Sequence, residues 1–226
     1  MSLQTRDKGG HGYSFLPAAG HHFLTPWYDS FSALLGLGRG FKTKVVEAAG
    51  IVDGASVLDL ACGTGLTALL VKQRYPRCAV TGLDVDPNIL KIAGRHMAKA
   101  GVSGVDLVCA PAEKTGLEGA SFDVVISTLA FHHLPPGSKE DAAGEVARLL
   151  RVGGTFLLVD LQPLTRTLRA LRKEQPTSPR WGFRANTAEK LRQVLSGAGL
   201  EVQDVDPPRT WAFRPWMFAM RGTKLR

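Results

Sequence analysis

The sequence predicts an α/β fold in which helices cover both faces of a mostly parallel sheet. Short apolar segments typical of buried strands occur near 56–61, 79–84, 105–109, 123–128 and 155–160. Longer segments suited to helices lie between them, near 65–73, 87–100 and 139–151. Strands that alternate with helices in this way form parallel sheets buried on both faces. The chain has 226 residues, which is enough to bury one complete core.

The region before the first strand has a different pattern. Residues 1–25 have few periodic apolar positions, whereas residues 26–50 have the pattern of two helices separated near 36–40. We therefore expect residues 1–50 to form an N-terminal segment and a helical cover. Residues 51–226 are expected to hold the sheet, within a single globular domain.

The sequence also marks the start of one helix and the elements expected after the fifth strand. Asp86 followed by Pro87 is a favourable helix start, because a capping side chain precedes a proline in the first turn. A helix near 187–197 follows the fifth strand, and the apolar segments 200–205 and 211–222 come after it as expected strands.

The most informative stretch is 57–65, which reads Val-Leu-Asp-Leu-Ala-Cys-Gly-Thr-Gly. It predicts a buried strand with Asp59 near its end, followed at once by a glycine turn and a helix. Glycines permit positive φ and let a ligand lie against the backbone. The N-terminus of the next helix offers free N–H groups to that ligand. The next strand ends in Asp84, so the unit has a carboxylate at each of two strand ends.

The spacing of these residues suits an adenosine ligand. Asp84 follows Gly63 by 21 positions, close to the spacing of about 20 at which an acidic residue reaches a ribose hydroxyl. A carboxylate can accept hydrogen bonds from both ribose hydroxyls. Residues 63–68 also fit the dinucleotide fingerprint, which keeps a nicotinamide oxidoreductase open as an alternative. Asp59, at a position usually apolar or glycine in that fold, argues against it.

Four motifs in order resemble those of the class I S-adenosylmethionine-dependent methyltransferases. They are the segments 59–65, 82–87, 121–128 and 150–160. The resemblance covers roughly residues 28–220, and the segment 27–29 is similar to the ubiquinone/menaquinone C-methyltransferase branch. It implies a Rossmann-like three-layer sandwich with a mostly parallel seven-stranded sheet and an antiparallel C-terminal edge strand.

The resemblance also implies a set of cofactor-binding residues. They are Asp59, Ala61, Cys62, Gly63, Thr64, Gly65, Asp84, Val85, Ala112, Glu113 and Thr128. Asp59 is expected to face the methionyl amine, Asp84 the ribose and Thr128 the methionyl side. Many relatives place Asp or Asn at the position of Pro111 to receive the adenine amino group. Pro111 has no side-chain acceptor, so adenine contacts are expected from backbone groups or Glu113.

The candidates for a catalytic base are His132 and His133, which directly follow the fourth strand. Methyl transfer from a sulfonium depends largely on positioning, but an acceptor hydroxyl or ring carbon can need a base. Histidine suits that role because its pKa lies near neutrality. The alternative is that both are loop residues without a chemical role. A second pair, His21 and His22, lies in the N-terminal segment and is open to the same two interpretations.

The positive charge is concentrated at the C-terminal end. Residues 164–226 hold 13 Lys or Arg and 5 Asp or Glu, which accounts for the net charge of +8. Within residues 161–173, leucines recur at helical spacing between arginines. This segment is interpreted either as an amphipathic helix in peripheral contact with an anionic membrane surface, or as a packed helix with a solvated basic face.

Composition excludes several classes of protein. Three widely spaced cysteines do not form a disulfide framework and favour a reducing compartment. Apolar runs fall short of the ~18 residues that span a bilayer. The polar N-terminal residues do not resemble a secretory signal, so we expect a cytoplasmic protein. There is no metal-ligand spacing, and a metal is not expected to be required.

These observations support one leading hypothesis. The chain is predicted to be a methyltransferase that uses S-adenosyl-L-methionine, releases S-adenosyl-L-homocysteine and methylates a small-molecule or lipid-like acceptor. A nucleic-acid methyltransferase that uses the basic C-terminal region is the first alternative. The sequence carries no strong nucleic-acid signal, since the Asn/Asp-Pro-Pro-aromatic and Pro-Cys segments are absent. A non-catalytic protein that binds the nucleoside is the second.

Overall fold

The computed structural model describes residues 36–135, 137–163, 186–208 and 216–226. Their elements run in the following order: α2 (Arg39–Ala48), β1 (Ser56–Leu60), α3 (Leu66–Arg74), β2 (Ala79–Asp84), α4 (Pro87–Lys99), β3 (Val105–Cys109), β4 (Phe122–Thr128), the 3₁₀ helix η2 (Phe131–His133), α5 (Ser138–Leu149), β5 (Leu150–Leu161), α8 (Ala188–Gly197), β6 (Leu200–Val205) and β7 (Met217–Lys224). Helices and strands alternate as the sequence predicts.

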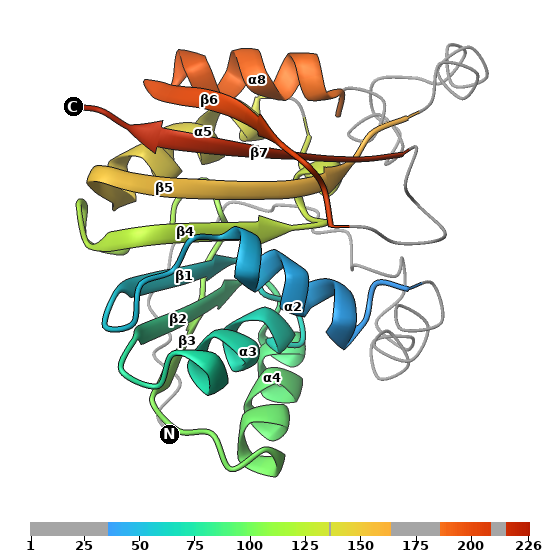
Figure 1. Cartoon of the computed structure of the whole chain (residues 1–226), viewed down its shortest axis with the longest axis vertical. Helices are drawn as coiled ribbons and strands as arrows, with labels where there is room; N and C mark the ends of the chain where they lie inside the picture. Colours follow the sequence, from blue (N-terminus) through green and yellow to red (C-terminus); the bar gives the residue numbers. More distant parts are fainter. Residues whose placement is uncertain (1–35, 136, 164–185, 209–215) are drawn as a thin grey trace.

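A seven-stranded sheet lies at the centre, with the strand order β3-β2-β1-β4-β5-β7-β6 (Figure 1). The five strands from β3 to β5 pair in parallel, whereas β7 runs antiparallel to both β5 and β6. The mostly parallel sheet with antiparallel C-terminal strands is therefore confirmed. The antiparallel strand β7 lies one place in from the edge, and β6 forms the edge itself.

The sheet is covered on both faces, which confirms the three-layer architecture (Figure 1). One core cluster joins Val57 and Val80 of the sheet to apolar residues of α2, α3 and α4. A second joins Leu58 and Leu83 to apolar residues of α5 and α8. Neighbouring residues of a strand thus enter opposite cores, as the alternation of side chains in a strand requires. The strands read as continuous apolar runs because both of their faces are buried.

The carboxyl ends of the parallel strands meet at one edge of the sheet. From β1 the chain passes to β2 and β3 on one side, and then to β4 on the other side. This reversal of direction makes the space beyond β1 and β4 the switch point, where open α/β sheets bind ligands. Asp59, Asp84 and Thr128 all lie at this edge.

One boundary differs from the expected one, and another is confirmed. The fifth strand begins at Leu150, ahead of the expected range 155–160, because Leu150 already pairs with Phe122 across a register shift. The helix start at Asp86 is confirmed, since its side chain accepts a hydrogen bond from the Asn88 amide at 2.8 Å. The first of the two expected N-terminal helices falls in residues 26–35, outside the described residues.

Candidate cofactor and active site

Asp59 is a buried carboxylate inside β1, with a relative exposure of 1%. One of its oxygens, Oδ2, accepts a hydrogen bond from the Ala68 amide in α3 at 3.0 Å. The other, Oδ1, is buried and has no hydrogen-bond partner among the described residues. Burial raises the pKa of Asp59 to about 6, although Lys42 opposes the rise. A buried acceptor without a donor is costly, so Oδ1 is suited to a ligand that brings a donor.

The loop between β1 and α3 has a backbone that favours glycine. Gly63 has a φ of +55° and Gly65 a φ of +77°. A Cβ on Gly65 would lie 2.9 Å from the Cβ of Ala93 in α4, so α4 packs directly against the loop. The neighbouring Ala61 also has a positive φ, of +58°, which is uncommon for a residue with a side chain. A glycine at position 65 is therefore needed for α4 to pack this closely against the loop.

Asp84 links the second strand to this loop. Its Oδ2 accepts a hydrogen bond from the Gly63 amide at 2.8 Å, and its Oδ1 accepts one from the Asp86 amide at 3.1 Å. Burial raises its pKa, and the two amides oppose that rise. Each carboxylate oxygen can accept more than one hydrogen bond, so both retain capacity for ribose hydroxyls. The next residue, Val85, is exposed beside it.

The segment expected near adenine continues from β3, next to Asp84. Cys109 pairs with Asp84 in the sheet, and the Ala110 amide donates to the Asp84 carbonyl at 3.1 Å. Ala112 and Glu113 follow within this segment and are half-buried. The Pro111 carbonyl accepts a hydrogen bond from the amide at position 114, at 3.2 Å, which closes a turn. The structure therefore brings these residues to the strand ends, but it gives Glu113 no distinct role.

Cys62, one of the expected cofactor-binding residues, has its side chain in the core. Its side chain is buried and packs against Gly82, where an added Cβ would lie 3.2 Å from its sulfur. Burial and the nearby Asp59 and Asp84 raise the pKa of its thiol well above the usual value. A neutral, packed thiol is a core residue and not a nucleophile.

Thr128 ends β4 and is held by a residue that the sequence did not single out. It is buried, and its Oγ1 accepts a hydrogen bond from the Lys42 ammonium of α2. Thr64 in the loop is buried as well, and its carbonyl lies 3.2 Å from Nδ1 of His96. Helix α2 thus reaches the carboxyl ends of the strands with a cationic side chain.

The two candidate bases lie in η2, directly after β4, and have different surroundings. The His132 amide donates to Oδ2 of Asp160 at 3.0 Å, and its ring Nδ1 lies 2.5 Å from Oδ1 of the same carboxylate. Asp160 is fully buried in β5. Burial alone would raise its pKa, but His132, the Leu161 amide and Lys139 together lower the pKa of Asp160. His133 is exposed, and its ring centroid lies 4.0 Å from that of His132.

Comparison with known proteins agrees with this geometry. Residues 57–154 match a family model described as a methyltransferase domain. The ubiquinone/menaquinone biosynthesis C-methyltransferase UbiE of Pseudomonas fluorescens is 34% identical over 151 residues, which is 65% of this chain and 58% of that protein. The matched region, residues 57–154, is therefore a methyltransferase domain that resembles those of the class I S-adenosylmethionine-dependent family.

Other similar proteins share the sequence motifs or the fold of this methyltransferase domain. A demethylmenaquinone methyltransferase of Thermus thermophilus is 34% identical over 145 residues, covering 62% of this chain and 63% of that protein. The chain thus spans less than two thirds of these curated relatives. A solved S-adenosylmethionine-dependent methyltransferase of Aquifex aeolicus has a TM-score of 0.66 at 19% identity, over 88% of this chain and 95% of that one. A Haemonchus contortus phosphoethanolamine N-methyltransferase, solved with S-adenosylhomocysteine, has a TM-score of 0.72 at 16% identity. The match covers 92% of this chain and 58% of that one.

A buried polar network lies behind the histidines of the methyltransferase domain. The Lys139 ammonium donates to Oδ1 of Asn186 at 2.8 Å, and Nδ2 of Asn186 donates to the Leu161 carbonyl at 2.5 Å. Burial lowers the pKa of Lys139 to about 8, against the influence of Asp160. Sequence reasoning missed both residues, because nothing in the pattern around them distinguishes them from surface positions.

Some sequence interpretations cannot be placed in the fold. The segment 27–29, the pair His21 and His22, and residues 164–173 of the basic segment lie outside the described residues. Within the described ranges, no group of three or more His, Cys, Asp or Glu could hold a metal ion. The helices of that part of the chain are all too short or too polar to cross a bilayer.

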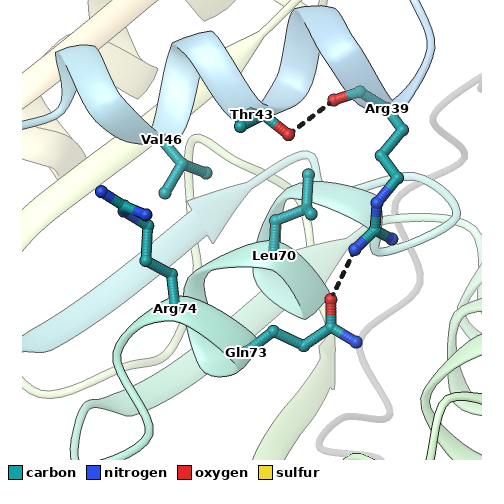
Figure 2. A pocket seen from close by; sticks show the side chains of 6 residues that line it. All are labelled: Arg39, Thr43, Val46, Leu70, Gln73 and Arg74. Carbon is teal, nitrogen blue, oxygen red and sulfur yellow. Dashed lines mark hydrogen bonds between the residues drawn. The ribbon is translucent and has the colours of Figure 1, made fainter.

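A separate hollow lies on the surface between α2 and α3 (Figure 2). It has a volume of about 330 Å³ and is lined by Arg39, Thr43, Val46, Leu70, Gln73 and Arg74. Arg39 donates to the Gln73 side chain at 2.8 Å across its mouth. Its lining includes none of the expected cofactor-binding residues, so it is distinct from the site at the strand ends.

Proposed function

We propose that this chain is an S-adenosylmethionine-dependent methyltransferase that methylates a small, quinone-like aromatic acceptor and releases S-adenosylhomocysteine. The observation that carries the proposal is the buried Oδ1 of Asp59, which has no donor among the described residues, at the switch point of the sheet. A methionyl ammonium is a donor that would satisfy it. We assign the ribose to the second carboxylate, Asp84, whose Oδ2 accepts a hydrogen bond from the Gly63 amide at 2.8 Å.

The residues at the strand ends fit the parts of this donor. We assign Asp59 to the methionyl amine, the loop 61–65 to the methionyl and ribose portion, and Asp84 to the ribose hydroxyls. Val85, Ala112 and Glu113 border the adenine, and Thr128 lines the methionyl side. Three of these assignments have support in the geometry: the orphaned oxygen of Asp59, the glycine-lined loop and the amide-held carboxylate of Asp84.

The donor supplies an already activated methyl group, so the chain has to bind, orient and exclude water. Methylation of a ring carbon or hydroxyl releases one proton. We assign the acceptance of that proton to the His132 ring, because the Asp160 carboxylate orients this ring through Nδ1. His133 has no hydrogen-bonded carboxylate of this kind among the described residues, where its ring contacts that of His132, and it is the weaker candidate. The quinone-like acceptor is suggested by the relatives, whose names specify ubiquinone, menaquinone and demethylmenaquinone.

The test is the transfer of label from methyl-tritiated S-adenosylmethionine to a short-chain demethylmenaquinol. Bulk RNA is the competing acceptor in a parallel reaction, and the Asp84→Ala variant controls for contaminating enzymes. We expect label in the organic phase that is lost in the variant. Label in RNA alone would replace the proposed acceptor with a nucleic acid. Tight binding of S-adenosylhomocysteine with no transfer to any acceptor would make the chain a binding protein.

A further inference from the structure

The connection between β3 and β4, residues 110–121, contains no helix or strand, and we call it the β3–β4 loop. It begins at the strand ends, where the Ala110 amide donates to the Asp84 carbonyl at 3.1 Å. It ends beside α5, where the Ser121 amide donates to the carbonyl at position 149 at 2.9 Å. The residues assigned to adenine lie near its start. Their position therefore depends on what holds a segment that has no regular structure of its own.

Glu145 of α5 holds the middle of the β3–β4 loop. Its Oε1 accepts hydrogen bonds from the Thr115 amide at 3.0 Å and from the Thr115 hydroxyl at 2.5 Å. Thr115 is buried, and its hydroxyl oxygen accepts in turn from the Leu117 amide at 3.2 Å. One carboxylate thus fixes both the backbone and the side chain of a residue that lies two positions after Glu113.

Arg148, one turn later in α5, reinforces this contact. Its Nε and Nη2 donate to the two oxygens of Glu145 at 2.7 and 2.8 Å, and Nη2 also donates to the Leu117 carbonyl at 2.7 Å. The hydrogen bond from Arg148 lowers the pKa of Glu145 to about 2; Thr115 acts in the same direction and burial opposes it. Glu145 is therefore ionised at neutral pH, and its hydrogen bonds to Thr115 are of the stronger, charge-assisted kind.

The conformation of the loop matters because of the proline at position 111. Pro111 offers a ligand neither a side-chain acceptor nor an amide. Contacts with adenine then depend on the backbone of the loop and on residues such as Ala112 and Glu113. Backbone groups meet a ring in one geometry only while the loop keeps one conformation. A loop that has to be ordered on binding lowers the affinity, because only its ordered fraction binds.

We propose that Glu145 is a positioning residue for the adenine part of the site, and that it acts through Thr115 on the β3–β4 loop. This inference rests on the proposed function, because it names a further residue on which the same site depends. The amino acid end and the ribose of the donor are assigned to other parts of the chain. Only the contacts with adenine should therefore depend on Glu145.

The test compares two ligands by calorimetry on the full chain. One is S-adenosylhomocysteine, and the other is S-ribosylhomocysteine, which keeps the amino acid end and the sugar but lacks adenine. We expect Glu145→Ala to weaken binding of S-adenosylhomocysteine roughly 10-fold, since the released loop must be ordered on binding. The affinity for S-ribosylhomocysteine, measured by its displacement of S-adenosylhomocysteine, should be unchanged. Asp141→Ala removes an exposed carboxylate one turn earlier in α5 and should change neither affinity, so it is the matched control.

A second variant perturbs the same contact more gently. Thr115→Val keeps the shape of the side chain and the pair of Glu145 with Arg148, and it removes only the hydrogen bonds of the hydroxyl. It should show the same pattern with a smaller loss, roughly 2- to 10-fold for S-adenosylhomocysteine, as expected for a single hydrogen bond.

The two ligands separate a positioning role from a general loss of structure. A smaller folded fraction would weaken both ligands equally, and equal losses would overturn the role of Glu145 while leaving the proposed function intact. Unchanged binding of S-adenosylhomocysteine in both variants would overturn that role as well. Failure of the wild type to bind S-adenosylhomocysteine would overturn the proposed function, and the role of Glu145 with it.

Discussion

The carboxylate of Asp84 accepts a hydrogen bond of 2.8 Å from the amide of Gly63, across 21 positions of the chain. This contact ties the tip of β2 to the loop that follows β1. The same carboxylate also accepts from the Asp86 amide, so it orders the start of α4 as well. Asp84 therefore has two functions in the proposed site, since it shapes the loop and presents acceptors to a ribose.

Asp84→Ala should weaken binding of S-adenosylhomocysteine by roughly 10- to 100-fold, because hydrogen bonds to a charged acceptor are lost. The Gly63 amide loses its acceptor, so its hydrogen exchange should also become faster. Calorimetry measures the first effect and exchange mass spectrometry the second. Asp106→Ala removes an exposed carboxylate of β3 and should change neither result. An unchanged affinity in Asp84→Ala would remove Asp84 from the ribose site.

The sequence predicts the strand-end part of the site because its residues are close along the chain. Asp59 and the loop 61–65 belong to one continuous segment, and Asp84 ends the next strand. Apolar runs locate the strands, and a parallel sheet brings strand ends together without further information. The strand order on both sides of β1 does not follow from the alternation of helices and strands, because parallel sheets with different strand orders share that pattern.

Lys42 and Asn186 could not be predicted in this way. Lys42 lies in α2, where a cation on an amphipathic helix has the same pattern as a solvated residue. Its proximity to Thr128 depends on how α2 packs on the sheet, across 86 positions of sequence. Asn186 reaches Lys139 across 47 positions. Contacts of this kind are set by tertiary packing, and no local propensity encodes them.

Gly65→Ala should destabilise the domain more than Gly101→Ala. Both glycines have positive φ, which costs a residue with a Cβ about 1–2 kcal/mol. A Cβ at Gly65 would also lie 2.9 Å from Ala93, whereas one at Gly101 meets no atom within 4 Å. This overpacking should add about 1–3 kcal/mol to the destabilisation caused by Gly65→Ala. Urea unfolding of both variants measures the difference, and equal losses would show that α4 can move away from the loop.

Asp59→Asn should stabilise the ligand-free protein at neutral pH. Burial raises the pKa of Asp59 from 3.8 to about 6, so the folded state binds its proton more tightly than the unfolded state. The stability from this group is therefore present below the unfolded pKa and is lost as the pH rises through about 6. At neutral pH this rise in the pKa of Asp59 lowers the free energy of unfolding by on the order of 2–3 kcal/mol.

The stability gain of Asp59→Asn should therefore grow as the pH increases from about 4 to about 7. Urea unfolding of both proteins at several pH values measures it. The variant should gain less thermal stability than the wild type when S-adenosylhomocysteine is added, because the methionyl amine loses its carboxylate. A variant that is less stable than the wild type at every pH would show that the Oδ1 of Asp59 has a structural donor.

His132→Ala should lower kcat far more than His133→Ala. If the His132 ring accepts the acceptor's proton, its loss should cost roughly 10²- to 10⁴-fold in kcat. His133 is exposed, so its removal should have little effect. Affinity for S-adenosylhomocysteine, measured by calorimetry, should stay the same in both variants, because neither histidine is assigned to the donor.

Asp160→Asn separates the chemical role of the histidine from a structural one. An asparagine can still accept from the His132 amide, but it no longer stabilises a protonated ring. We therefore expect Asp160→Asn to lower kcat while the affinity for S-adenosylhomocysteine stays the same, because the His132 ring loses the carboxylate that orients it. A purely structural role for the pair would instead lower the free energy of unfolding and leave the kcat of the folded variant unchanged. Equal kcat values for the wild type and His132→Ala would exclude His132 as the base.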